Sequence, residues 1–209
     1  MLVAFFADRG HAEVTPYPRV PGDEANSDYV SVRVNGVEVD TVGTSMNVGY
    51  AHFAFAGTAK VEIAAKEPIE TFDLSPHRLK IPASVAGNVL TLQLTEPRKL
   101  HLRVNGLSRF FIFAEAPERN APQPGQPGVI SVGEFGVVSD PQKTQTEALQ
   151  RAIDQVAETR GVLHVPPGIY RTGRLLLRSN LSLYLAPGAI IKGTGKLADY
   201  PRTDGNTQQ

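Results

Sequence analysis

The pattern of apolar and polar positions changes twice along the chain. Between residues 30 and 115, short runs of alternating apolar and polar residues are typical of half-buried β-strands. Over residues 145–159 the apolar positions recur at helical spacing, which predicts one amphipathic helix. Beyond Gly161 the apolar residues return in short bursts that are separated by turn residues. The chain therefore predicts a mainly β protein in which one helix divides two different β regions.

The first β region predicts an antiparallel β-sandwich. Val30, Val32 and Val34 share one strand face, and the Asn35-Gly36 pair that follows is a strong hairpin signal because both positions tolerate positive φ. Short strands at close spacing with no helix between them are typical of a sandwich. Strands are expected at residues 37–42, 50–55, 60–65, 71–74, 89–94, 99–104 and 109–113, and residues 1–28 are expected to form a short leading strand and a loop.

A linker is predicted at residues 117–128. Their sequence, PERNAPQPGQPG, contains four prolines and two glycines and has no apolar pattern. Proline-rich segments of this kind act as semi-rigid spacers. The composition therefore divides the chain into an accessory domain at residues 1–116 and a second domain at residues 129–209.

Two signals mark the ends of the helix predicted at residues 145–159. Thr144 precedes the helix as a candidate N-cap, and Glu147 follows three positions later, which is the spacing of a capping box. Arg160-Gly161 supplies a glycine stop signal. The helix is expected to cover the open end of the β region that follows, because apolar interior and unpaired strand edges would otherwise meet water.

The second β region predicts a β-solenoid. Parallel strands without helical crossovers can stack when the chain coils like a spring. From His164 to Leu183 is 19 positions, a suitable length for one coil. The apolar bursts that would form the coils lie at residues 163–165, 175–177, 181–185 and 189–191, divided by Pro-Gly and Arg-Ser-Asn turns.

Composition argues against several classes of function. Lysine plus arginine and aspartate plus glutamate both number 21, so no net charge attracts nucleic acid or an anionic membrane. The absence of cysteine excludes disulfides, thiolate metal sites and cysteine nucleophiles. The opening, MLVAFFADRG, lacks the basic region of a secretory signal, and no apolar stretch reaches the length of a membrane span. These features favour the cytoplasm, although a processed amino terminus would look the same.

Candidate catalytic groups are dispersed. Asp154 and Glu158 lie one helical turn apart, which is more typical of a solvated helix face than of a catalytic dyad. His164 lies within an apolar strand and is expected to be a hydrogen-bonded, partly buried side chain rather than a base. The sequence therefore predicts no catalytic, cofactor-binding or metal-binding residue. The other groups considered, none at the spacing of a carboxylate pair, a metal site or a phosphate loop, are Asp140, Glu147, Asp199, Asp204, His11, His52, His77, His101 and the Gly193-x-Gly195 turn.

Three phenylalanines near the end of the first β region allow two interpretations. Phe110, Phe111 and Phe113 could form a platform on which a sugar ring stacks, because sandwich modules do bind sugars. The interpretation favoured by the pattern is core filling by the last strand, with the rings facing the core of the sandwich and the next domain.

Residues 134–201 carry a recognisable succession of motifs. These are, in order, Glu134-Phe135-Gly136, the helical TEALQRAID, GVLHVPPGIYRTG, SNLSLYLAPGA and Asp199-Tyr200-Pro201. In order and spacing they resemble the opening of the polygalacturonase-type glycoside hydrolases, family 28, with their pectin-lyase-like right-handed β-helix. The resemblance implies an amino-terminal antiparallel β-sandwich, a capping helix and the first coils of a right-handed parallel β-helix. The preceding HFAFAG and VNGL segments, at residues 52–57 and 104–107, are more loosely similar to the sandwich of bacterial members.

The resemblance also implies a chemistry. Hydrolysis in this family is similar to the inverting scheme, in which one carboxyl group protonates the leaving oxygen and another carboxylate activates water. The motifs for those groups, Asn-x-Asp, Asp-Asp, Gly-His-Gly and Arg-x-Lys, belong to later coils, and none follows the first coils in residues 1–209. The expectation is therefore an amino-terminal fragment that acts on pectin-like polysaccharide only as part of a longer enzyme. Where relatives have Gly-Asp-Gly, this chain has Ser139-Asp140-Pro141, a departure that bears on subfamily more than on fold.

Other functions stay open from the sequence. One is a stand-alone carbohydrate-binding or interaction module, in which the sandwich binds sugar. Another keeps the β-helix and changes the chemistry to that of a polysaccharide lyase or a dextranase-like hydrolase, because a fold is shared more widely than an active site. The expected partners are an oligosaccharide or polysaccharide, without nucleic acid, membrane or cofactor, and a second copy that binds through the unfinished β-helix end.

Overall fold

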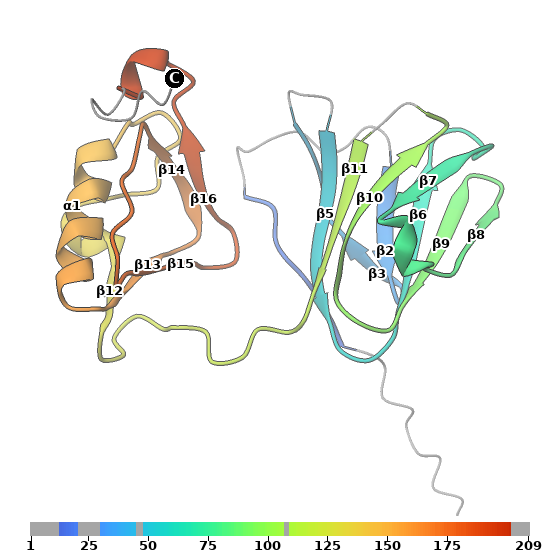
Figure 1. Ribbon diagram of the computed structural model, residues 1–209, viewed down its shortest axis with the longest axis horizontal. Helices are drawn as coiled ribbons and strands as arrows, with labels where there is room; N and C mark the ends of the chain where they lie inside the picture. The colour runs from blue at the N-terminus through green and yellow to red at the C-terminus, as the bar shows by residue number, and fades with distance from the viewer. Residues whose placement is uncertain (1–12, 21–29, 45–47, 107–108, 202–209) are drawn as a thin grey trace, which may run out of the picture. The chain divides into compact units, whose positions relative to one another are not determined.

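The computed structural model describes residues 13–20, 30–44, 48–106 and 109–201 (Figure 1). The described residues are mainly β-strands with one α-helix, as the pattern predicts. Contacts divide the chain between Arg119 and Asn120 into two compact units, and each is described by itself. In the described residues no helix is long and apolar enough to cross a membrane.

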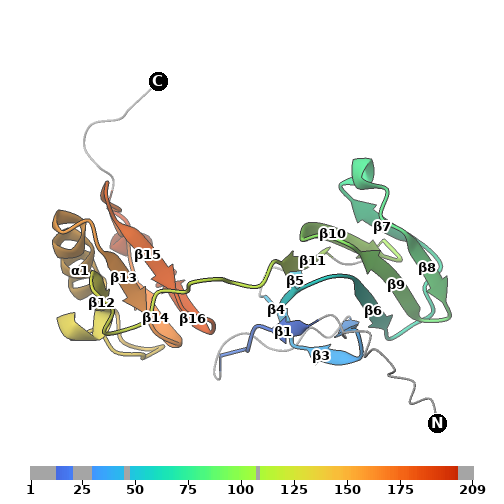
Figure 2. The same ribbon diagram turned by 90° about the horizontal axis from the view of Figure 1, so that it is seen from below.

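The first unit contains two sheets. One has the strand order β1-β5-β11-β10-β7, with β4 also pairing with β5, and the other has the order β3-β2-β6-β9-β8 (Figure 2). All the pairings are antiparallel except that of β5 with β11, which is parallel. The strands are β1 (Val14–Pro16), β2 (Val30–Val34), β3 (Val37–Val39), β4 (Thr41–Gly43), β5 (Val48–Phe55), β6 (Ala59–Ala65), β7 (Phe72–Ser75), β8 (Ala83–Ala86), β9 (Val89–Leu94), β10 (Arg98–Val104) and β11 (Arg109–Glu115), and a 3-10 turn, η1 (His77–Leu79), follows β7.

The two sheets share one hydrophobic core. Alternate residues of β2 are buried, so that its valines point inward while Ser31 and Arg33 are exposed. The opposite sheet contributes Phe53 and Phe110 to the same cluster, and both side chains are fully buried. Burying one such side chain stabilises the fold by about 1.5–3 kcal/mol relative to exposure. The period-two pattern of the sequence therefore determines which face of each strand packs inward.

The strand predictions for this unit are confirmed with three exceptions. The strand expected at residues 37–42 is two strands, β3 and β4, which pair in different sheets. The hairpin between β2 and β3 turns at Asn35 and Gly36, whose φ angles of 49° and 84° are both positive. Strand β8 was not predicted. Its four residues are all exposed, so neither of its faces packs on the core. Every pairing was expected to be antiparallel, whereas β5 and β11, which are distant in sequence, pair in parallel.

The second unit is built from parallel strands around α1 (Thr146–Glu158). One sheet has the order β12-β13-β15, and β14 pairs with β16 in a second sheet. Leu163 pairs with Leu183, 20 positions later, so the predicted repeat of 19 is short by one residue. The strands are β12 (Val129–Ser131), β13 (Val162–Val165), β14 (Gly168–Thr172), β15 (Ser182–Leu185) and β16 (Ala189–Gly193), with 3-10 turns η2 (Val132–Phe135) and η3 (Leu197–Asp199).

One predicted strand of this unit is wrong and another was missed. Residues 175–177 form no strand, because the backbone N–H and C=O of Leu176 bond to the side chain of Gln150 instead of to a neighbouring strand. The missed strand is β14, which begins at Gly168, where the Pro167-Gly168 pair predicts a turn. Its Ile169 and Tyr170 are buried, and Tyr170 belongs to the core of the unit.

Helix α1 covers this core with one face, as predicted. Its Leu149, Ile153 and Val156 are fully buried in the cluster that also contains Leu163 and Val165 of β13. Both views of the ribbon show α1 beside β13 (Figures 1 and 2). The apolar residues at helical spacing therefore form the face of α1 that packs on the core.

The predicted capping box at the start of α1 is wrong. The N-cap is Gln145, not Thr144, and it makes no side-chain cap. The Gln145 side chain instead bonds both backbone groups of Val138, at 2.9 and 2.8 Å, and it is 5% exposed. A capping box does occur earlier, where Ser131 and Glu134 close the start of η2.

The stop signal at the end of α1 works differently from the prediction. The helix ends at Glu158, and the positive φ of 55° falls on Arg160 rather than on Gly161. A Cβ on Gly161 would lie 2.9 Å from the carbonyl oxygen of Gly128. Glycine is therefore required at this position for close backbone approach and not for a left-handed conformation.

Replacement of Gly168 tests the packing at the start of β14. Its φ is +143°, and a Cβ there would overlap the side chain of Ser139, which is itself held by the Ile169 N–H. We expect Gly168→Ala to destabilise the second unit by about 3 kcal/mol, through strain and overlap together. The matched control is Gly195→Ala, where φ is +71° and the space is open, with a cost of about 1 kcal/mol. Amide hydrogen exchange of β14 and β16 measures both, and equal effects would contradict the role of Ser139.

Candidate functional site

The carboxylates of the second unit lie in separate places. Asp140 accepts hydrogen bonds from the backbone N–H groups of Gln142 and Lys143, at 2.8 and 3.1 Å, and so closes a turn. Glu147 and Glu158 are exposed on α1. Asp199 lies in η3, and Asp204 lies outside the described residues. Each of these described carboxylates thus has a separate setting, and the absence of a catalytic pair stays a prediction.

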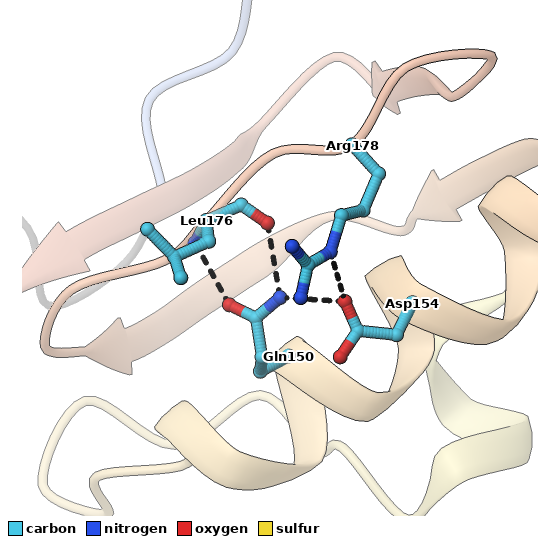
Figure 3. Close-up of polar contacts among 4 residues, drawn as sticks. All are labelled: Gln150, Asp154, Leu176 and Arg178. Carbon is cyan, nitrogen blue, oxygen red and sulfur yellow. Dashed lines mark hydrogen bonds and ion pairs between the residues drawn. The ribbon is translucent and has the colours of Figure 1, made fainter.

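Asp154 belongs to a polar cluster that ties α1 to the segment after β14 (Figure 3). One of its carboxylate oxygens accepts hydrogen bonds from Arg178, at 2.7 Å, and from Gln150, at 2.9 Å. Gln150 in turn accepts from the N–H of Leu176 and donates to its C=O, at 2.8 and 2.9 Å. We call these four residues the α1 clamp. They replace the strand pairing that Leu176 lacks.

The α1 clamp changes the acidity of Asp154. Hydrogen bonds from Arg178 and Gln150 lower the pKa of Asp154 below its ordinary value. Because the folded pKa is depressed, the stabilising contribution is present at neutral pH and is lost as the pH falls through the folded pKa. Asp154 is therefore ionised and engaged with Arg178 at neutral pH, which suits a structural role rather than proton transfer.

His164 is more buried than predicted. It is 5% exposed, so the expectation of a partly buried ring is wrong, and its Nδ1 has no hydrogen-bond partner among the described residues. Strand register places it between Ser131 of β12 and Tyr184 of β15, and its ring centroid is 5.4 Å from that of Tyr184. The ring is therefore enclosed by the neighbouring strands.

The other histidines of the described residues lie in separate places. His77 is exposed and pairs with Asp73 at 2.6 Å, and His11 lies outside the described residues. His52 and His101 lie on β5 and β10 among aromatic rings. In the parts of the chain that the structure describes, no three His, Asp or Glu side chains lie close enough together to hold a metal ion.

The outer face of the six-stranded sheet carries six rings in mutual contact. They stand on the side of the strands opposite the core, and we call them the aromatic face. Tyr17 stacks on His52 at 4.1 Å, and Phe111 lies parallel to Phe113 at 6.2 Å between ring centroids. Edge contacts of 5.9 and 6.0 Å join Tyr50 and His52 to Phe113, and His101 lies 5.0 Å from Phe111. All six rings are partly exposed.

The aromatic face separates the three phenylalanines of the sequence analysis. Phe110 is 1% exposed and fills the core, as predicted. Phe111 and Phe113 point to the other side of β11 and belong to the aromatic face. Their expected contact with the next domain stays a prediction. Alternate residues of β11 face opposite sides of the sheet, which separates Phe110 from the other two. Cross-strand neighbours on β5 and β10 complete the aromatic face.

Burial within the aromatic face affects its titratable groups. Burial lowers the pKa of His52, and Lys99 lowers it further against the opposing effect of Glu115. His52 is therefore neutral at pH 7, since its pKa lies below the ordinary value of about 6.5. Burial also raises the pKa of Tyr17, so its hydroxyl stays protonated and can donate a hydrogen bond.

Comparison with known proteins finds similarity in part of the sequence and in the fold. No protein-family model matches the chain. Over 75 residues, 36% of the chain, it is 39% identical to the exo-poly-alpha-D-galacturonosidase of Dickeya chrysanthemi. The matched stretch covers 12% of that relative's length. The resemblance to the amino-terminal portion of polygalacturonase-type glycoside hydrolases is therefore confirmed, at partial coverage.

Among solved structures, Dex49A from Penicillium minioluteum has a TM-score of 0.55 with this chain at 15% identity. The match covers 86% of this chain and 44% of that one, and at this identity it concerns the fold alone. The family 28 exopolygalacturonase of Yersinia enterocolitica has a TM-score of 0.35 at 19% identity, over 70% of this chain and 32% of that one. That superposition is too weak to add to the argument.

Removal of the Gln150 side chain tests the α1 clamp. We expect Gln150→Ala to speed hydrogen exchange of the Leu176 amide by about tenfold or more, because two hydrogen bonds to that residue are lost. Gln155→Ala is the matched control, since Gln155 is exposed on the same helix. Exchange measured by NMR reports the Leu176 amide directly. An unchanged rate in Gln150→Ala would show that the segment is held by other contacts.

Proposed function

We propose that this chain is the amino-terminal part of a glycoside hydrolase that acts on pectin-like polysaccharide by inverting hydrolysis. The observation that carries the proposal is the 39% identity over 75 residues to an exo-poly-alpha-D-galacturonosidase. The chain spans 12% of that relative's length, so the activity belongs to a longer protein. The name of this relative indicates polymers of galacturonate as its substrate class, and we propose the same class for this protein.

Within this proposal the first unit is a β-sandwich accessory domain at residues 1–116. Two sheets that share one core support it. Residues 117–128 are the linker, and residues 129–209 start a right-handed parallel β-helix with α1 as its cap. The support is the parallel register of β13 with β15 and of β14 with β16, at repeats of 20 and 21 residues and with no helix between the paired strands.

The coils of the second unit would provide a template for the active site. Strands β15 and β16 each pair on one side only among the described residues, so a further coil can add to them in register. Inverting hydrolysis needs two carboxyl groups roughly 6.5–9.5 Å apart, on either side of the sugar. Asp140 and Asp154 are engaged in a turn and in the α1 clamp. The catalytic carboxylates are therefore expected on later coils.

The activity of the extended gene product tests this function. We expect the 209-residue chain to release no reducing sugar from polygalacturonate, whereas the product extended through the downstream coding sequence releases galacturonate. Replacing a downstream aspartate by asparagine should lower that rate by about 10²–10⁴-fold, the usual contribution of one acid or base group. Asp154→Asn in the extended product is the control and should leave the rate unchanged, because Asp154 has a structural role.

The same assay separates the alternative chemistries. An ultraviolet-absorbing unsaturated product would identify a lyase, and release of sugar from dextran but not from polygalacturonate would identify a dextranase-like hydrolase. A genuine stop codon directly after residue 209 would contradict the proposal of a longer enzyme.

Self-association is the second property that the proposal implies for the isolated chain. Leu183 and Leu185 of β15 and Ile190 of β16 lie on strands that have one edge without a further partner among the described residues, and Leu185 is 44% exposed. We expect the 209-residue chain to dimerise in light scattering and Leu185→Lys to shift it to monomer, because a charge at an edge opposes pairing. Val85→Lys, at a position of 38% exposure on β8, is the control. A monomer at high concentration would contradict this prediction.

A further inference from the structure

The aromatic face is an ordered array. Strand register places His101 of β10, Phe111 of β11 and Tyr50 of β5 in one cross-strand row. A second row runs through Lys99, Phe113 and His52, and the Tyr17 N–H bonds to the backbone of His52 at the end of that row. Two rows of rings, with phenol and imidazole groups among them, thus lie side by side on the outside of the sheet.

Such a face is unusual for the outer side of an antiparallel sheet. The outer side is ordinarily polar, since only the inner side packs on the core. The outer side of β2 follows this rule, with Ser31 and Arg33 exposed. A contiguous group of rings on an outer face typically marks a binding surface. The core of this unit closes without these rings, because the inward residues of the same strands already fill it.

Two arginines stand at one edge of the aromatic face. In the hairpin of β10 and β11, Arg103 and Arg109 are the residues next to the last paired residues, Leu102 and Phe110. Both are exposed, and neither has an ion pair with an acidic side chain among the described residues. Strand register sets Arg103 opposite Asp73 of β7, whose carboxylate contacts His77. Lys99, at the other edge, already pairs with Glu115 at 3.4 Å.

The combination of rings and paired guanidinium groups selects a ligand class. Aromatic faces pack against the C–H faces of sugar rings, and phenol and imidazole groups can bond to hydroxyl groups. Paired arginines bind carboxylates through short, charge-assisted hydrogen bonds. A neutral sugar would leave the arginine pair unused, and a nucleic acid would meet a chain with no net positive charge.

We propose that the aromatic face binds an acidic oligosaccharide, with sugar rings on Phe111, Phe113 and their neighbours and a uronate carboxylate on Arg103 and Arg109. This is a binding site on the first unit, separate from the hydrolytic chemistry proposed for later coils. It would hold a polyuronate chain on the same protein that cleaves it. Only the choice of galacturonate as the uronate rests on the proposed function.

Calorimetric titration of trigalacturonate into the 209-residue chain tests the site. We expect binding that weakens about tenfold or more in the double variant Arg103→Gln, Arg109→Gln, because two charge-assisted contacts are lost. These positions are exposed, so the variant should fold normally. Arg33→Gln, an exposed arginine on the outer face of the other sheet, is the matched control and should bind like the parent. Affinity should also fall with added salt.

Two further arms address the rings and the sugar. Phe111→Leu with Phe113→Leu keeps apolar volume and removes the flat faces, and it should also weaken binding by about tenfold, a size expected from aromatic contact. Maltotriose, which has no carboxylate, should bind the parent more weakly than trigalacturonate does. Its affinity for the arginine double variant should equal its affinity for the parent.

The outcomes that overturn the proposal are distinct. If trigalacturonate fails to bind, or binds the arginine double variant as tightly as the parent, the site is wrong, whatever the extended product hydrolyses. If the phenylalanine double variant changes the oligomeric state and not the affinity, the face is a protein contact. Failure of hydrolysis by the extended product with binding intact would reject the proposed function and leave this site standing.

Discussion

The second unit depends on the parallel pairing of β13 with a strand on each side. Its backbone bonds to β12 and β15, and its Leu163 and Val165 point into the core under α1. One four-residue strand therefore joins the sheet to the helix. Glycine stands where another segment approaches closely, as at Gly161 against the backbone of Gly128 and at Gly168 against the side chain of Ser139. Removing that register would leave α1 without the apolar surface that it covers.

Asp154 is held in place by contacts that the chain needs after β14. Residues 175–177 leave the sheet, and their backbone groups need partners. Gln150 supplies them, Asp154 orients Gln150 and Arg178, and the cluster is satisfied. The first unit differs, because its outer face holds aromatic rings and an arginine pair beyond what the core requires. Structural and recognition chemistry are thus distributed between the two units.

Much of this fold could be predicted from the sequence because its signals are local. Alternation located β2, β5, β6, β9, β10 and β11, and helical spacing located α1. The signals failed where a distant residue decided the outcome. Leucines 175–177 have strand-like composition, but the Gln150 side chain takes the hydrogen bonds of Leu176. Gln145 starts α1 without capping it because its amide is bound to Val138.

The aromatic face was only half predictable for a related reason. The three phenylalanines of β11 are visible in the sequence, and period two separates Phe110 from the other two. Their neighbours Tyr50 and His52 come from a strand 61 residues earlier, through the parallel pairing of Arg109 with Val48. No local sequence pattern predicts that pairing. Arg103 and Arg109 come next to the last paired residues of one hairpin, Leu102 and Phe110, so their place at one end of it could have been found from the two strands alone.

That long parallel pairing also sets the order in which the chain can fold. Pairing Val48 with Arg109 closes a loop of about sixty residues, whereas the strand pairs of the second unit join residues 20, 21 or 33 positions apart. Contacts between distant residues are slow to form, because loop closure costs entropy before any contact repays it. The first unit must wait for almost its entire length to be synthesised. In the second unit, β15 can pair with β13 and β16 with β14 as the chain emerges, after α1 has been synthesised.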